Sequence, residues 1–567
     1  MPDAVLPAGQ RALIAEFGTL SEVLAFHDQV KASPLPGQTE TVAAARTVLL
    51  AFRSHREAVA GAKQVRRMKL RTPRHDHAPQ IDVRVHYDGE DLEPLAQHLG
   101  TSPEALISWH TSTVWVAAFG GAAPGFAYCV PEELARRRRP RKSELLAGGE
   151  PIPKRSSPRS AIPAGGVVLA DEFSAVCPRR TPGDWQLIGT SDADLWNLER
   201  GGPGGPALIR PGDRVRYVRA AERIEVAERA PSPPTTRSPM LEVIEPGAQT
   251  LIQDVGRKGC AGLGAARSGA ADVAALRQAN QLVGNDDGAA AFEVLWGGFA
   301  LEVHQTCVLA VTGAEAELEI SSPVPQDRSN MAVAGTGAAP LEEQRQCREA
   351  AQRAPFWMHA GERLTIAQPS AGLRSYVAVS GGLEAAPTLG SRSTDTLSGL
   401  GPPPVRAGET FGLEGVTSRF VGIADVARTP LPSDETVVLR FAVGPREACF
   451  ADQERPRRRN PGLETLQQQR WTVSKDADRV GMRLLPEEGE RLEVTAGGQL
   501  PSEPVVRGAV QVPPDGHPVL LLVDHPVAGA YPVIGVVVRE DLGLAAQLPP
   551  GASVSFQAVD PETLQPL

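Results

Sequence analysis

The sequence predicts a mainly β protein with α+β parts. Glycine and proline are abundant, at 56 and 51 of the 567 residues, and they separate many short segments in which apolar and polar residues alternate. A phrase that joins a glycine turn to such a segment recurs, as RPGDRVRY (210–217), HAGERLTI (359–366), RAGETFGL (406–413) and PPGASVSF (549–556). A turn of this kind leads naturally into the closing strand of a small barrel, so we expect more than one related β-barrel.

Two helices are predicted from their ends. Thr101 and Glu104 have the spacing of a capping box, with Pro103 in the first turn, and they open a helix through EALISWH. The segment DVAALRQANQLVGN (272–285) has apolar residues near helical spacing and ends on Gly284 and Asn285, which are typical stop signals. The segment TETVAAARTVLLAFRSH (39–55) fits a helix, a strand or both.

Length and charge exclude several classes of protein. A chain of 567 residues is long enough for several cores. It carries 58 basic and 67 acidic residues, a net charge of −9, which argues against a nucleic-acid partner. No apolar run reaches membrane length and the N-terminus lacks a signal pattern, so we expect a cytoplasmic protein with no membrane contact. No Cys or His spacing typical of metal ligands occurs, so no metal site is predicted.

A polar loop at residues 390–395, GSRSTD, has the residue types of a reactive site. Gly390 permits a positive φ or a close backbone approach, and Arg392 offers a planar fork that matches carboxylate or phosphate. Asp395 could serve as a base, a metal ligand or a cap, while Ser391 and Ser393 supply hydroxyl groups. The alternative is a turn whose side chains satisfy only their own backbone.

The blocks around this loop resemble one half of a known family. Residues 381–401 read GGLEAAPTLGSRSTDTLSGLG; the other blocks are LEVIEPGAQTLIQDVGRKG (241–259), SGAADVAALRQANQLVGNDDGAAAFEVLWGG (268–298), TVSKDADRVGMRL (472–484) and GAVQVPPDGHPVLLLVDHPVAGAYPVIGVV (508–537). In this order they are similar to the C component of the 5-oxoprolinase/urea amidolyase family, also called KipA-like or allophanate hydrolase subunit 2, a biotin-dependent carboxyltransferase-like protein. The resemblance covers nearly all of residues 241–557.

The N-terminal part resembles the partner protein of the same family. It carries HTSTVWVAAFGGAAPGFAY (110–128), PKRSSPRSAIPAGGVVLA (153–170), PGDWQLIGTSD (182–192) and PALIRPGDRVRYV (206–218), which are similar to the B component, the KipI-like protein or allophanate hydrolase subunit 1. Between the two parts lies AERAPSPPTTRSPM, whose prolines indicate a stiff spacer. The chain is therefore expected to be a B–C fusion.

The resemblance implies several cyclophilin-like β-barrels and a small N-terminal α/β subdomain. We expect an α/β subdomain at 1–100, a barrel at 101–222, a Pro-rich linker at 223–239, and a C-like half at 240–567 with two subdomains, at about 240–400 and 401–567. Residues 136–150 look like an insertion of unassigned role.

Candidate site residues in the B-like half come from two motifs. His110 and the aromatic pair Phe126 and Tyr128 belong to the first, although a structural histidine and a core phenylalanine explain these residue types equally well. Arg155 and Arg159 precede the PAGG turn that contains Gly165, and together they could bind an anion. A solvated basic loop is the competing interpretation.

The C-like half supplies further candidates in DHPVAGAYP (524–532). His525 is a candidate general base, with Asp524 as its orienting partner or as a base itself. Adjacent residues on a strand point to opposite faces, however, so the two need not cooperate. Gly529 and Tyr531 lie on the turn that follows and are candidate binding residues.

A second carboxylate–guanidinium motif is Asp478 with Arg479, which could bind substrate or form a plain salt bridge. Glu293 interrupts an apolar strand, so it is either exposed or a buried acid with a partner.

The resemblance implies ATP-dependent hydrolysis of 5-oxoproline to glutamate, with ATP and Mg²⁺, by B and C components that act with a separate A component of the LamB/YcsF-like type. The sequence contains no GxxxxGK[ST] loop, so a site of another kind must hold ATP. No biotin attachment context is visible. The alternatives are a carboxyltransferase component that acts with a biotin-carrier partner and KipI-like binding of a histidine kinase. Self-association into a homo-oligomer stays open.

Overall fold

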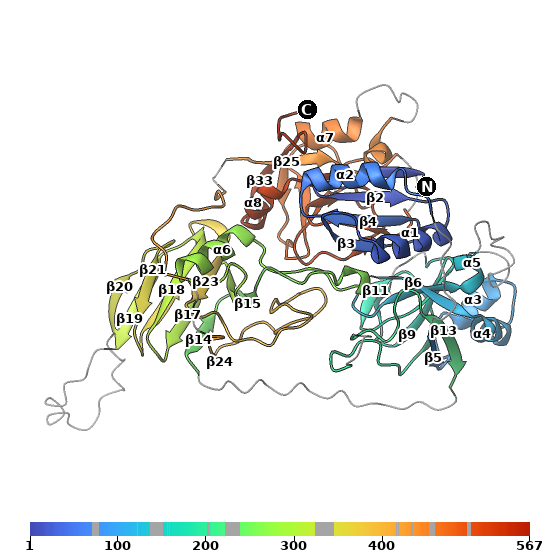
Figure 1. Cartoon of the computed structure of the whole chain (residues 1–567), viewed down its shortest axis with the longest axis horizontal. Coiled ribbons are helices and arrows are strands. Elements are labelled where there is room, and N and C mark those ends of the chain that lie inside the picture. The colour runs from blue at the N-terminus through green and yellow to red at the C-terminus, as the bar shows by residue number, and fades with distance from the viewer. Residues whose placement is uncertain are drawn as a thin grey trace.

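The structure is a computed structural model, and it describes residues 1–567 except 71–78, 122, 137–150, 156, 158, 201–204, 221–238, 324–344, 416, 418, 433–434, 453–459 and 496–499. It confirms a mainly β protein with α+β parts. Figure 1 shows four units, which we name the N-terminal unit (4–65), the first barrel (80–219), the middle unit (241–411) and the C-terminal barrel (437–558). The predicted linker and insertion lie largely outside the described residues.

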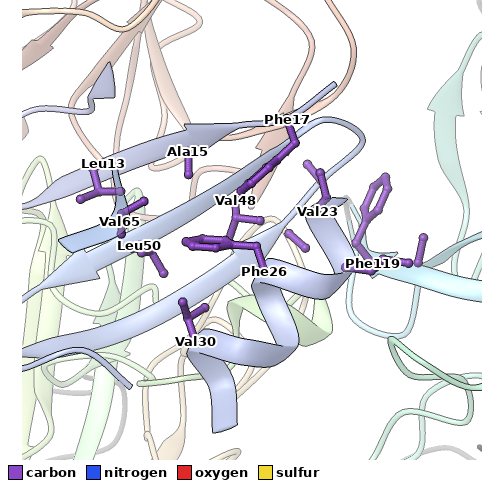
Figure 2. Close-up of a cluster of buried hydrophobic side chains, with 14 of the residues drawn as sticks. Leu13, Ala15, Phe17, Val23, Phe26, Val30, Val48, Leu50, Val65 and Phe119 are labelled. Atoms are coloured by element: carbon purple, nitrogen blue, oxygen red, sulfur yellow. The ribbon is translucent and has the colours of Figure 1, made fainter. Parts of the chain in front are cut away.

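The N-terminal unit is an antiparallel sheet covered by two helices. Its strand order is β1-β2-β4-β3. Its elements are β1 (Ala4–Pro7), β2 (Ala12–Glu16), α1 (Leu20–Ala32), β3 (Gln38–Ala43), β4 (Thr47–Phe52) and α2 (His55–Val65). Figure 2 shows Val23 and Phe26 of α1 pointing at Val48 and Leu50 of the sheet, with Phe119 of the first barrel in the same buried cluster. The ambiguous segment 39–55 is thus a strand pair that leads into α2.

The first barrel is a seven-stranded sheet in the order β12-β9-β10-β7-β6-β13-β5. Its elements are β5 (Gln80–Val85), α3 (Leu92–His98), α4 (Pro103–Ser112), β6 (Trp115–Gly120), β7 (Ala127–Pro131), α5 (Glu132–Arg136), β8 (Arg159–Ile162), β9 (Gly166–Ala170), β10 (Phe173–Val176), β11 (Thr181–Gly183), β12 (Gln186–Thr190) and β13 (Arg214–Arg219). A bridge between His86 and Thr190 joins the two outer strands. Because β5 pairs with β13, the barrel begins at residue 80, ahead of the predicted boundary at 101.

The middle unit packs two sheets around one core, which includes Leu301, Leu309 and Val377. The sheet orders are β20-β19-β22-β17-β14-β24 and β15-β16-β23-β18-β21. The elements are β14 (Leu241–Pro246), β15 (Gln249–Gln253), η3 (Ala261–Leu263), α6 (Val273–Leu282), β16 (Ala291–Leu295), β17 (Phe299–Val303), β18 (Cys307–Glu315), β19 (Leu318–Pro323), β20 (Arg345–Glu349), β21 (Pro355–Met358), β22 (Arg363–Ile366), β23 (Ala371–Val379) and β24 (Glu409–Phe411). Since β24 pairs with β14, this unit extends past the predicted boundary near 400.

The C-terminal barrel is closed, in the order β25-β32-β29-β30-β27-β26-β33. Its elements are β25 (Val437–Val443), η5 (Glu447–Phe450), α7 (Pro461–Gln468), β26 (Trp471–Val473), β27 (Gly481–Pro486), β28 (Glu503–Pro504), β29 (Ala509–Gln511), β30 (Val519–Leu521), β31 (Ala528–Gly529), β32 (Val533–Val537), η6 (Arg539–Asp541), α8 (Leu542–Ala546) and β33 (Ser553–Ala558). Trp471 and Phe441 are fully buried in its core.

The recurring glycine phrase has the predicted structure. Each copy turns at a glycine with positive φ and continues as β13, β22, β24 or β33. Gly212, at φ 100°, and Gly551, at φ 87°, precede the strands that pair in parallel with β5 and β25. Both predicted helices exist as α4 and α6, although α4 is capped by Ser102 rather than Thr101.

The N-terminal unit lies against the C-terminal barrel, although the two are far apart in sequence (Figure 1). The Arg446 guanidinium contacts Glu16 at 2.5 Å and Glu503 at 2.5 Å, and the amide of Ala45 donates to the carbonyl of Ser502. A cavity of about 300 Å³ lies at this contact. No helix in the described ranges is both long and apolar enough to cross a bilayer.

Candidate functional site

The polar loop at 390–395 is anchored by Asp254, which follows β15. One carboxylate oxygen accepts hydrogen bonds from the hydroxyls of Ser391 at 2.7 Å and Ser393 at 2.5 Å. The other accepts from the backbone amide of Arg392 at 2.7 Å. These three bonds fix the conformation of the loop, and Ser391 and Ser393 are completely buried. Both serines therefore have a structural part in this loop.

Asp395 closes the next turn of the chain. Its carboxylate accepts from the amides of Leu397 and Ser398, at 3.0 Å each, and from the Ser398 hydroxyl. Burial raises the pKa of Asp395, and the negative charge of Asp524 raises it further. Asp395 is thus a fully buried carboxylate that holds a proton more readily than an ordinary aspartate.

Asp524 and Arg479 form the buried ionic centre of the site. Arg479 donates from Nε to one Asp524 oxygen at 2.9 Å and from Nη2 to the other at 3.1 Å. Its Nη1 pairs with Glu293 of β16, so it links the C-terminal barrel to the middle unit. Burial alone would raise the pKa of Asp524, but the charge and hydrogen bonds of Arg479 outweigh burial and hold it below its usual value.

Two further donors fix Asp524 to the loop. Ser268 donates from Oγ at 2.6 Å, and Thr396 donates from its amide at 3.0 Å and from its hydroxyl at 2.8 Å. Each carboxylate oxygen therefore accepts from Arg479 and from one further residue, which is Ser268 for Oδ1 and Thr396 for Oδ2. Asp524 acts as a rigid anchor between the C-terminal barrel and the loop that contains Asp395.

Arg257 is a buried cation beside this loop. Its side chain is almost completely buried, and Nη2 donates to the carbonyl of Ser393. Its Nε and Nη1 are buried and have no hydrogen-bond partner among the described residues. Burial lowers the pKa of Arg257, while the charges of Asp395 and Asp254 oppose that effect. These two donors lie on different edges of the guanidinium group, and each can donate to a carboxylate or an oxyanion.

A residue of the first barrel reaches the same loop. Arg179, which precedes β11, donates from Nη1 to the carbonyl of Leu397. Burial lowers the pKa of Arg179, and the charge of Asp395 acts in the opposite direction. The loop is therefore held by Arg257 from the middle unit and by Arg179 from the first barrel. We call this place, formed by Arg179, Arg257 and residues 393–398, the seam.

Comparison with known proteins identifies the two halves. Family models for the carboxyltransferase domain match residues 263–558 (subdomains A and B) and residues 4–204 (subdomains C and D). The C component of 5-oxoprolinase from Escherichia coli (strain K12) is 32% identical over 318 residues, which are 56% of this chain and 90% of that protein. The B component of 5-oxoprolinase from Escherichia coli O157:H7 is 35% identical over 149 residues, 25% of this chain and 60% of that protein.

The chain is a B–C fusion of the 5-oxoprolinase/urea amidolyase family. A solved structure shows the same arrangement in another single chain. The crystal structure of TTHA0988 superposes with a TM-score of 0.77 at 31% identity, and the match covers 96% of this chain and 99% of that one. The predicted order of B-like and C-like parts is thereby confirmed.

Within the B–C fusion, some of the predicted residues of the C-like half meet at the loop and others lie outside its contacts. Asp395, Asp524, Arg479, Ser391 and Ser393 meet at the loop. Arg392 belongs to the loop, but its side chain pairs with Glu414, and its Nε is buried without a partner among the described residues.

Asp478 does not pair with Arg479. Its carboxylate is exposed and accepts the amides of Val480 and Gly481, so it stabilises a turn. His525 Nδ1 lies 2.8 Å from the carbonyl oxygen of Pro526, and no hydrogen bond joins His525 to Asp524 among the described contacts. The cooperation of Asp524 and His525, which the sequence left open, has no direct contact behind it here.

Gly529 and Tyr531 also lie outside the seam's contacts. Gly529 pairs with Glu503 between β31 and β28, and Tyr531 is an exposed aromatic residue. Their assignment as binding residues stays a prediction.

His110, in the B-like half, is a core residue rather than part of a shared crevice. Its ring nitrogens lie 2.8 Å from the Tyr87 hydroxyl and 2.9 Å from the Ser174 hydroxyl, and the ring stacks on Tyr217. It is completely buried, and burial lowers its pKa to about 3. A ring with both nitrogens occupied inside a barrel organises the core, so we remove His110 from the catalytic candidates.

Phe126 and Tyr128 belong to an aromatic cluster with Trp185. Phe126 is buried. Burial raises the pKa of Tyr128 to about 12, and a hydrogen bond to Ser502 partly offsets this effect. The turn ahead of them packs on η3, where Gly125 donates to the carbonyl of Leu263. The pair thus helps to hold the halves together.

The arginines of the predicted anion-binding loop are paired with acidic residues that precede α3. Arg155 and Arg159 both bind Asp91, and Arg159 also binds Glu90 at 2.6 Å. Gly165, at φ 76°, turns the chain where it approaches the backbone of Ser191. These residues join the barrel strands to α3, and their cations are not free for a ligand.

Sequence reasoning missed the residues that complete the seam, namely Asp254, Arg257, Ser268, Thr396 and Arg179. The first four lie inside the blocks that carry the family resemblance, and polar residues in an apolar block are a usable signal. Arg179 has no such signal, since its contact spans 218 residues. In the described ranges, no group of three or more His, Cys, Asp and Glu side chains is arranged to hold a metal ion.

Proposed function

We propose that this B–C chain acts with a separate A component in the ATP-dependent hydrolysis of 5-oxoproline to glutamate. The observation that carries the proposal is the seam, where Arg179 of the B-like half donates to the carbonyl of Leu397 and Arg257 of the C-like half donates to the carbonyl of Ser393. The relatives named as the B and C components of 5-oxoprolinase match these two halves. A site completed by both halves gives a reason for the two to work as one unit.

The chemistry requires activation of a stable lactam. Amide resonance makes the ring carbonyl a poor electrophile, and ring closure is entropically easy, so hydrolysis needs an energy source. Phosphorylation of the carbonyl oxygen by ATP would give a good electrophile. Such a site needs cations for the substrate carboxylate and the phosphate, and a base for water.

The seam supplies these groups. The free Nε–H and Nη1–H of Arg257 would bind the substrate carboxylate or the developing oxyanion. Asp395, whose pKa burial raises, would take the proton of the attacking water. Arg479, Asp524 and Glu293 would hold both residues in place. Arg257 is 1% exposed, so substrate entry requires a local movement that uncovers it.

The proposal is tested by mixing the purified chain with a candidate A component, 5-oxoproline and Mg-ATP, and measuring glutamate and ADP. Asp395→Asn and Arg257→Gln should each lower kcat/KM by about 100-fold or more, as loss of a base or an oxyanion donor does. Arg392→Ala should lower turnover less, because its Nη2 already pairs with Glu414. The matched control is Asp478→Asn, since that carboxylate serves an exposed turn. Normal turnover in both seam variants would refute this assignment.

A second candidate is carboxyl transfer from a biotinylated partner, because both family models describe carboxyltransferase subdomains. It predicts that a carboxylated biotin carrier, without an A component, loses its carboxyl group to a small acceptor in the presence of the chain. Formation of glutamate and ADP without any biotin protein would favour oxoprolinase instead.

A further inference from the structure

Five arginines lie where the N-terminal unit, the middle unit and the C-terminal barrel meet. Arg11 precedes β2, Arg267 follows η3, Arg277 lies on α6, Arg507 precedes β29 and Arg539 starts η6. We call these five residues the arginine cluster. It belongs to neither the seam nor the predicted anion loop of the first barrel.

Contacts across the unit boundaries place the members together. The Arg539 amide donates to Gln10 Oε1 at 2.8 Å, next to Arg11. Arg507 donates from Nη2 to the carbonyl of Ala271, which lies between Arg267 and Arg277 in the chain. The same three units also share a buried apolar cluster, which includes Ala12, Ala266 and Val527, and Ala12 and Ala266 are the chain neighbours of Arg11 and Arg267. The cluster therefore sits on a fixed, three-sided junction.

None of these guanidinium groups forms an ion pair with a described residue, whereas Arg446 and Arg479 each contact two carboxylates. The Nε atoms of Arg277 and Arg507 are buried and lack a hydrogen-bond partner in the described part of the chain. Arg267 and Arg539 are exposed, so the cluster is open to a ligand. The junction thus combines buried, unpaired donors with an accessible cationic surface.

The positive charges act on one another. Although Arg539 is exposed as a whole residue, partial desolvation of its guanidinium group lowers its pKa, and Arg11, Arg277 and Arg267 lower it further against the opposing effect of Glu540. Burial lowers the pKa of Arg507 to about 10, and Arg267 contributes in the same direction. Carboxylates also act on the cluster: Glu40 on Arg267, Asp272 on Arg507, Asp287 on Arg277 and Glu540 on Arg539. A bound anion would relieve this repulsion.

We propose that the arginine cluster binds the phosphate chain of a nucleoside triphosphate. Guanidinium forks match phosphate oxygens, and a phosphate chain places several negative charges within a few bonds. An acidic protein segment spreads its charges over separate side chains and reaches buried Nε–H groups less well. The identification of the nucleotide as ATP rests on the proposed function. The sequence contains no phosphate-binding GxxxxGK[ST] loop. The arginine cluster would bind the phosphates in place of such a loop.

The test measures binding of inorganic triphosphate and of Mg-ATP to the full-length chain by calorimetry. Arg267→Gln and Arg539→Gln remove exposed members without opening the core. Each should weaken both ligands by about tenfold or more, the effect of one charge-assisted hydrogen bond. The control is Arg483→Gln on the C-terminal barrel, an arginine already paired with Asp515 at 2.5 Å, which should bind as the wild type does.

The outcomes separate this inference from the proposed function. Binding of triphosphate that depends on Arg267 and Arg539 supports the site even if no glutamate is formed, and the oxoprolinase proposal then fails alone. Tight Mg-ATP binding that both variants retain overturns the site, as does no binding of either ligand, even when glutamate is produced. Loss of binding to the A component with unchanged triphosphate binding would make the cluster a protein-docking surface and would also overturn it.

Discussion

Arg479 and Asp524 form a two-point ion pair inside the protein, with N–O distances of 2.9 and 3.1 Å and side chains 3% and 0% exposed. Arg479 also contacts Glu293, so one guanidinium group joins the C-terminal barrel to the middle unit. The pair is the fixed base on which the loop containing Asp395 rests.

Arg479→Met should therefore destabilise the protein strongly. It leaves Asp524 buried without its paired cation and leaves Glu293 with the more distant Arg374, 3.7 Å away, and breaking such a buried pair costs about 3–5 kcal/mol. Urea unfolding followed by tryptophan fluorescence measures the loss. The matched control is Arg483→Met, because the Arg483–Asp515 pair is 40% and 43% exposed and is worth about 0–1 kcal/mol. An equal loss of unfolding free energy in the two variants would show that the buried pair stabilises the protein no more than the exposed pair does.

His110 predicts how stability changes with pH. Burial lowers its pKa from 6.5 to about 3 in the folded protein, so the unfolded chain binds a proton at a pH where the folded protein does not. Protonation of His110 in the unfolded chain therefore does not affect the free energy of unfolding above about pH 6.5. Below that pH it lowers the free energy of unfolding, by up to about 1.4 kcal/mol per pH unit.

The measurement is the urea midpoint of the wild type and of His110→Gln between pH 7 and pH 5. The variant is less stable throughout but should have a shallower slope. Some slope remains, because burial also lowers the pKa of His525. Parallel curves for the two proteins would mean that His110 is protonated in the folded barrel.

Arg446 predicts unequal roles for its two acidic partners. Glu503 is 6% exposed and Glu16 is 28% exposed. Glu503→Gln should cost about 3 kcal/mol because it leaves a buried cation underpaired, whereas Glu16→Gln should cost about 1 kcal/mol or less. Thermal unfolding measures the stability that each of the two variants loses relative to the wild type. A larger loss in Glu16→Gln would instead make the contact with the N-terminal unit the dominant one.

Local signals in the sequence predicted local structure well. The glycine phrases led to strands because a positive φ at residues such as Gly212 is required by the turn itself. Helix α6 (Val273–Leu282) lies within the predicted segment 272–285, and Asp272 is its N-cap, since that carboxylate accepts the amides of Ala274 and Ala275. The α4 cap is one residue later than predicted because Ser102, not Thr101, faces the amide of Ala105.

Long-range contacts decided the site and could not be predicted from residue types. Arg159 has the residue type of an anion ligand, but Asp91, 68 residues away, already occupies it. His110 has the residue type of a catalytic group. Its burial could not be predicted, because a motif does not reveal which face of its helix enters the barrel. The boundary at residue 101 was misplaced because β5 joins the barrel through parallel pairing with the distant β13.

The central claim is that both halves complete one site, and Arg179 tests it most directly. Arg179→Ala and its exposed neighbour Arg180→Ala are compared by steady-state kinetics with the A component, 5-oxoproline and Mg-ATP. We expect Arg179→Ala to lower kcat/KM by about tenfold or more, the value of a charge-assisted hydrogen bond, with an unchanged melting temperature, while Arg180→Ala stays at the wild-type rate. Identical kinetics in the two variants would contradict the claim that the first barrel contributes to the site.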